Sequence, residues 1–85
     1  MENYFKKVDL ILQDKIEKMP LKRNTAEKLY VYLKTYKECL TEMQDELRAF
    51  FNEFTESEKL SETEISELNK YNHTSMSSFV DKFKI

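Results

Sequence analysis

Apolar residues recur at spacings of three and four through the middle of the chain, as on one face of an α-helix. A helix that carried the whole stripe would be about 45 Å long, since each residue adds ~1.5 Å. A stripe of this length has to be covered by other elements. We therefore predict a central helix over residues 25–55 with a heptad-like apolar seam: Ala26, Leu29, Leu33, Tyr36, Leu40, Met43, Leu47, Phe50 and Phe54.

A shorter stripe precedes the central one and predicts a first helix over residues 2–18. Its apolar positions are Phe5, Val8, Leu12, Ile16 and Met19. The residue before a proline is pushed out of the α region, so Met19 and Pro20 should end this helix. The following stretch should be a short connector.

Capping signals mark where the other two helices begin. Asn24 followed by Glu27 has the spacing of a capping box and predicts the start of the central helix. Ser61 and Glu64 have the same spacing and predict a third helix over residues 62–83. Residues 72–78 are rich in short polar side chains that compete for the backbone, so a break there and a continuous helix are both open.

The chain contains no glycine, and Pro20 is its only proline, which leaves few residues for tight turns. We predict a single all-α domain over residues 1–85. Short connectors make sequential helices antiparallel neighbours. The expected architecture is a three-helix bundle, and the alternative is a long helical hairpin whose exposed remainder is covered by another chain.

Charge is divided along the sequence. Residues 15–37 contain seven basic and two acidic side chains, a net charge of +5, whereas residues 38–67 contain ten acidic and two basic, a net charge of −8. This order opposes the macrodipole of the central helix. One interpretation is an antiparallel homodimer in which basic residues of one copy face acidic residues of the other, Lys28, Lys34 and Lys37 against Glu42, Glu46 and Glu53. The alternative is a solvated surface with an accidental bias.

Aromatic residues gather at both ends of the central helix, with Phe50, Phe51 and Phe54 late in it and Tyr30 and Tyr32 early. Most of these rings are expected in the core of the bundle. Some could form an exposed surface for another protein, a role in which aromatic side chains are enriched.

Residues for catalysis or metal binding are sparse. Without glycine the chain cannot build a phosphate-binding loop of the usual kind. Cys39 and His73 are the only residues of their types, so no zinc site and no catalytic pair is expected. We predict no catalytic residue, no metal and no cofactor, and therefore not an enzyme.

The sequence therefore favours an interaction protein, such as an adaptor, an inhibitor or an export-type chaperone. Its partner would be another protein or a second copy of the chain. The alternative is a small nucleic-acid-binding regulator that uses a basic corner around Lys22 and Arg23, although the near-neutral charge makes nucleic acid the weaker expectation. We predict a cytoplasmic protein, because the chain has a single cysteine and shows no signal peptide or membrane span. The abundance of lysine and asparagine suggests a bacterial or phage source. The expected partner-binding residues are Tyr30, Tyr32, Lys34, Lys37, Glu42, Glu46, Phe50, Phe51 and Phe54.

Overall fold

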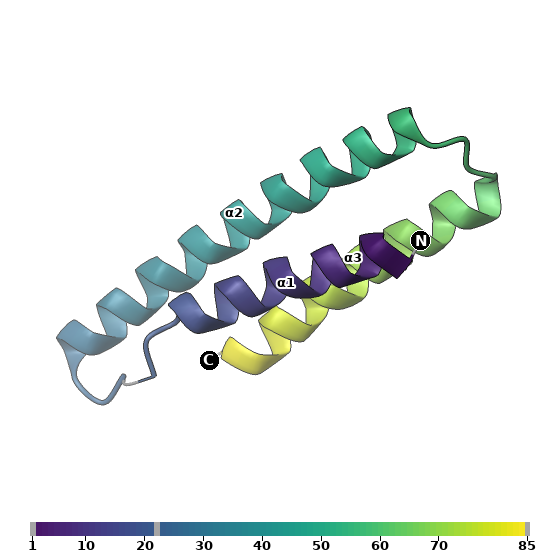
Figure 1. Ribbon diagram of the computed structural model, residues 1–85. Coiled ribbons are helices and arrows are strands. Elements are labelled where there is room, and N and C mark those ends of the chain that lie inside the picture. Colours follow the sequence, from purple (N-terminus) through teal and green to yellow (C-terminus); the bar gives the residue numbers. More distant parts are fainter. Residues whose placement is uncertain (1, 22, 85) are drawn as a thin grey trace.

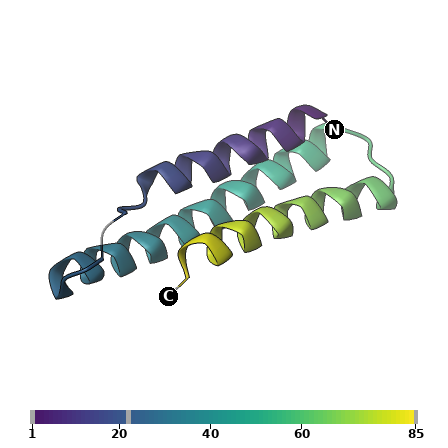
Figure 2. The same ribbon diagram turned by 90° about the horizontal axis from the view of Figure 1, so that it is seen from below.

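The computed structural model describes residues 2–21 and 23–84 and contains three helices, α1 (Glu2–Lys18), α2 (Ala26–Ser57) and α3 (Glu62–Phe83). They form an elongated bundle of about 50 × 18 × 16 Å. α1 and α3 run in the same direction, and α2 runs antiparallel to both (Figures 1 and 2). Every pair of helices is in contact. The all-α three-helix bundle is therefore confirmed, and the open hairpin is not formed.

The two connectors follow from local sequence. α1 ends at Lys18, two residues before Pro20, as expected. α2 is capped by Thr25, whose hydroxyl accepts a hydrogen bond of 3.2 Å from the backbone N–H of Lys28. The prediction of Asn24 as the cap is wrong by one residue, because Thr25 adopts the extended conformation of a cap and its hydroxyl reaches the first turn.

The start of α3 is the predicted capping box. The backbone N–H of Glu64 donates to the Ser61 hydroxyl, and the backbone N–H of Ser61 donates to the Glu64 carboxylate, at 3.2 and 3.1 Å. The helix is continuous through residues 72–78. Tertiary contacts outweigh the weak local propensity there: Ser75 is buried, and Asn72 accepts a hydrogen bond of 2.9 Å from the Tyr4 hydroxyl.

The buried face of α2 differs from the predicted seam. Met43 and Leu47 are buried as expected, but Ala26 and Leu33 are exposed. Two residues outside the seam, Tyr32 and Cys39, are buried instead, and Leu40 is only half-buried. The reason is that α2 packs against both α1 and α3, so contacts with both helices decide which of its residues are buried. Ala26 and Leu33 lie about 100° around the helix from the buried line of Tyr32, Cys39 and Met43, and therefore face solvent.

Aromatic rings fill both halves of the core. In one half, the Tyr4 ring stacks on Phe50 with centroids 4.7 Å apart. In the other, Tyr36 stacks on Phe79 at 5.7 Å. Such pairs stabilise a core beyond the area that they bury. Across the described residues, no helix is long and apolar enough to cross a membrane.

Candidate functional site

The most polar point of the helix packing is Lys15 on α1. Only 3% of its side chain is exposed, and its ammonium group lies 3.3 Å from the carboxylate of Asp14 and 3.2 Å from that of Glu42. It also forms an ion pair with Glu46. Lys18 extends the network, with contacts of 3.5 Å to Asp14 and 3.6 Å to Glu42.

These contacts control the titration of the groups. Burial alone would lower the pKa of Lys15, but its hydrogen bonds to Glu46, Glu42 and Asp14 outweigh burial and raise that pKa. Hydrogen bonding to Lys15 lowers the pKa of both Asp14 and Glu42. Lys15, Asp14 and Glu42 therefore stay ionised at neutral pH, and the contact between Lys15 and Glu42 attaches α1 to α2.

Glu42 and Glu46 are thus engaged within the chain rather than free to face a second copy. The sequence interpretation missed Lys15 because a lysine normally marks the solvent side of a helix. A signal was present, since Lys15 lies seven residues after Val8 and four before Met19, and both of these are buried. That spacing places it on the buried face of α1.

The late aromatic residues are also used within the bundle. Phe50, Phe51 and Phe54 are partly buried and pack against the core. Tyr32 is 4% exposed, and its hydroxyl donates a hydrogen bond of 2.8 Å to the backbone carbonyl of Phe83. These aromatic side chains therefore contribute to the core of one chain, as the sequence predicts for most of them.

At the opposite end of the bundle, α2 extends past α1 and α3 (Figure 1). We call this the basic end, formed by residues 19–21, residues 23–25 and the first turns of α2. Of the remaining predicted residues, Tyr30 is exposed at this end, and Lys34 and Lys37 are exposed further along α2, where Tyr32 and Tyr36 already contact α3. None of Lys28, Lys34 and Lys37 forms an ion pair with the described part of the chain.

Exposed apolar side chains also concentrate at the basic end. The exposed fraction is 90% for Leu21, 67% for Tyr30, 52% for Val31 and 45% for Leu33. Leu10 on α1, at 71%, is the other strongly exposed large hydrophobic among the described residues. Single exposed apolar residues are ordinary on a protein surface, but Leu21 and Val31 line the same groove, and grouped apolar residues mark an interaction site. Sequence reasoning counted Leu33 as core and did not single out Leu21 or Val31.

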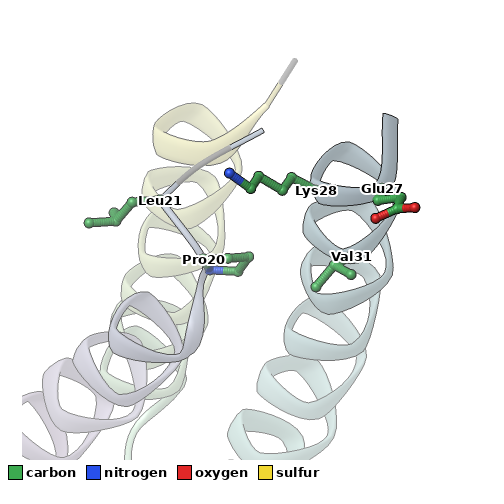
Figure 3. A pocket seen from close by; sticks show the side chains of 5 residues that line it. All are labelled: Pro20, Leu21, Glu27, Lys28 and Val31. Carbon is green, nitrogen blue, oxygen red and sulfur yellow. The ribbon is translucent and has the colours of Figure 1, made fainter. Parts of the chain in front are cut away.

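An open groove runs between the connector and α2 at this end. It has a volume of about 450 Å³ and is lined by Pro20, Leu21, Glu27, Lys28 and Val31. Pro20 and Val31 face each other across it, and the Lys28 side chain extends from α2 toward the connector (Figure 3). Leu21 projects from the outer side of the connector, and Glu27 points away from the groove. The groove therefore has apolar walls, the Lys28 cation between them and Glu27 at its edge.

The fold supplies a structural reason for the divided charge. Because α1 and α3 are parallel, their two C-termini meet the N-terminus of α2 at the basic end. The opposite, acidic end gathers two N-termini and one C-terminus, and Glu62 and Glu64 lie in the first turn of α3. Helix dipoles favour cations at C-termini and anions at N-termini. Much of the charge pattern thus suits the bundle itself, whereas the exposed apolar residues do not.

The other potentially reactive groups give no second site. Cys39 is a buried free thiol whose pKa is raised by burial, which disfavours the reactive thiolate. Within residues 2–21 and 23–84, no group of three or more His, Cys, Asp or Glu side chains could hold a metal ion.

Comparison of the chain with protein-family models, with curated proteins and with solved structures gave no match.

Proposed function

We propose that the protein is a non-enzymatic binding module that docks another protein at its basic end. The observation that carries this proposal is the pair of exposed apolar side chains that line the groove, Leu21 and Val31, with Tyr30 and Leu33 exposed elsewhere on the same part of α2. Exposing these side chains to water disfavours the free protein, and a partner that covers them recovers that cost. The unpaired lysines around them would orient the partner and speed its approach.

Adaptor, inhibitor and chaperone are all forms of this one activity. The proposed location is the cytoplasm, because the only cysteine is a free thiol, as is usual in reducing compartments. Of the predicted site residues, the proposal retains Tyr30, Lys34 and Lys37.

Binding of nucleic acid is the alternative use of the same end. Lys22, one of the two residues expected to carry it, lies outside the described residues. The Arg23 guanidinium lies over the Tyr32 ring at 5.0 Å from its centroid, so it is already stacked within the chain. The exposed aliphatic residues favour a protein, since single strands are bound mainly by aromatic stacking and cations.

Site-specific photocrosslinking in the native host tests the proposal. A photoreactive phenylalanine analogue replaces Val31 in one variant and, as the matched control, the exposed Glu67 of α3 in another. We expect a discrete protein adduct at position 31, absent at position 67. Adding Leu21→Glu to the position-31 variant should abolish the adduct by placing a charge beside the groove.

Two results would contradict the proposal. One is equal adducts at both positions, which indicates nonspecific collisions. The other is binding of a fluorescent duplex or single strand that survives moderate salt and is lost in Lys28→Glu, which assigns the basic end to nucleic acid. A second copy of the chain would be recognised as an adduct of twice the chain mass.

A further inference from the structure

We propose that the groove of the basic end takes an acidic segment of the partner through one bulky apolar side chain and a neighbouring carboxylate. The inference rests on the proposed function and specifies the chemistry of the partner. It combines two features of the groove: apolar walls that face each other, and a lysine side chain that extends between them.

The apolar half of the site is the gap between Pro20 and Val31. Their side chains point toward each other from the connector and from α2 (Figure 3). The volume of about 450 Å³ lies within the range of ligand pockets and holds a large aliphatic or aromatic side chain with part of its backbone. Pro20 has a fixed backbone torsion, so this wall loses little entropy on binding.

The charged half of the site is Lys28. Its ammonium group extends across the mouth of the groove, and it has no ion pair with the described residues. Glu27, the one acidic residue of the lining, points away from the groove. A basic partner segment would therefore be repelled and an acidic one attracted.

A second copy of this chain does not fit both halves. Its acidic residues gather at the end formed by the α2–α3 connector, where the aromatic side chains Phe50, Phe51 and Phe54 are partly buried against the core. Among the described residues, that end offers no strongly exposed large apolar side chain, and beside the exposed Leu10 on α1 the Asp14 carboxylate is already paired with Lys15 and Lys18. The partner that satisfies both halves is a different chain, with a bulky apolar side chain next to a carboxylate.

The test is an NMR titration of the full-length, isotope-labelled protein with a short acetylated and amidated peptide of leucine and glutamate at helical spacing. We expect saturable shifts in the amides of Leu21, Lys28 and Val31. Lys28→Glu should weaken binding about fivefold, the upper range for one exposed ion pair. Lys59→Glu is the matched control: it makes the same charge change at the acidic end and should leave the affinity unchanged.

Two matched peptides test the two halves separately. Replacing glutamate by lysine should remove binding to the parent protein and restore part of it to Lys28→Glu. Replacing leucine by serine should remove binding to both. In the protein, Val31→Ser should weaken binding of the leucine–glutamate peptide, whereas Leu10→Ser, the same change at an exposed site on α1, should not.

The inference would be overturned if the lysine peptide shifted the same amides as the glutamate peptide. It would also be overturned if the serine peptide bound as well as the leucine peptide. If the position-31 adduct forms in cells and the leucine–glutamate peptide fails to bind, the proposed function stands and only the chemistry assigned to the partner is wrong. If a single-stranded oligonucleotide moves the same amides at moderate salt and the peptide does not, both are wrong.

Discussion

Lys15 and Glu46 form an ion pair between α1 and α2 in which the lysine side chain is almost fully buried and the carboxylate is about half exposed. The pair is asymmetric, because only the cation depends on its partners for solvation. Removing the carboxylates leaves a buried charge without compensation, whereas removing the lysine leaves carboxylates that water can reach.

The first prediction follows from this asymmetry. Lys15→Met should leave the free energy of unfolding within about 1 kcal/mol of the parent or raise it, since a hydrophobic replacement of a buried ion is often neutral or stabilising. The double variant Glu42→Gln with Glu46→Gln should be clearly less stable. Chemical denaturation followed by circular dichroism measures both, and Glu53→Gln with Glu56→Gln is the control on exposed positions of α2. A Lys15→Met variant that is less stable than the double variant would mean that the charge itself holds the helices together.

The second prediction concerns pH. The folded-state pKa values of Asp14 and Glu42 lie below their ordinary values of 3.8 and 4.5. Their contribution to stability is therefore present above those ordinary values and is lost as the pH falls through the lower values of the folded state. Lys15 behaves in the opposite sense: its raised pKa preserves its contribution below 10.5 and loses it only at higher pH. Unfolding measured from pH 6 down to pH 2 should show a fall in stability that is smaller in Lys15→Met, and identical slopes in both proteins would refute the linkage.

The third prediction separates two neighbouring residues of α2. Met43 is 0% exposed, whereas Leu40 is half-buried, although the sequence places both on one seam. Met43→Ala should cost about 2–5 kcal/mol, the usual range for truncation of a fully buried side chain. Leu40→Ala should cost less, because water already reaches part of its site. Denaturation midpoints of the two variants give the order, and a larger effect at Leu40 would restore the heptad seam as the buried face.

The helices were predictable because their signals are local. The Met19–Pro20 stop and the Ser61–Glu64 capping box act within a single turn, so the sequence contains all the information that they need. The rotation of the core face of α2 toward Tyr32 and Cys39 was not local. It depends on two helices that contact α2 from different sides, which periodicity in one segment does not reveal.

The candidate site also combines residues that local sequence predicts with residues that only the fold brings together. Tyr30, Lys34 and Lys37 were predictable as exposed residues near a basic segment, but Leu21 and Val31 join them only because α1 and α3 stop short of the start of α2. The predicted helix lengths already differed, and this difference was the available signal. The parallel arrangement of α1 and α3 was also needed before the divided charge could be attributed to helix termini.

The fourth prediction uses two tyrosines of α2 that the sequence treated alike. Tyr32 is buried, and its hydroxyl donates to the Phe83 carbonyl at the end of α3, whereas Tyr30 is 67% exposed. Tyr32→Phe removes this hydrogen bond and leaves a carbonyl of the last turn without its partner, which should cost about 1 kcal/mol, the typical net value for a protein hydrogen bond.

Tyr30→Phe makes the same chemical change on the surface and should leave stability within about 0.5 kcal/mol of the parent. Hydrogen exchange localises the effect: in Tyr32→Phe the amides of the last turn of α3 should exchange faster, while those around the Ser61 cap stay unchanged. If both variants, or neither, loosen the end of α3, the Tyr32–Phe83 bond does not hold that helix against α2.

For binding, Tyr30 should matter more than Tyr32, since Tyr30 lies on the basic end and Tyr32 beneath it. A variant of Tyr30 that removes the ring, Tyr30→Ser, should therefore reduce partner adducts at position 31 while the protein remains folded.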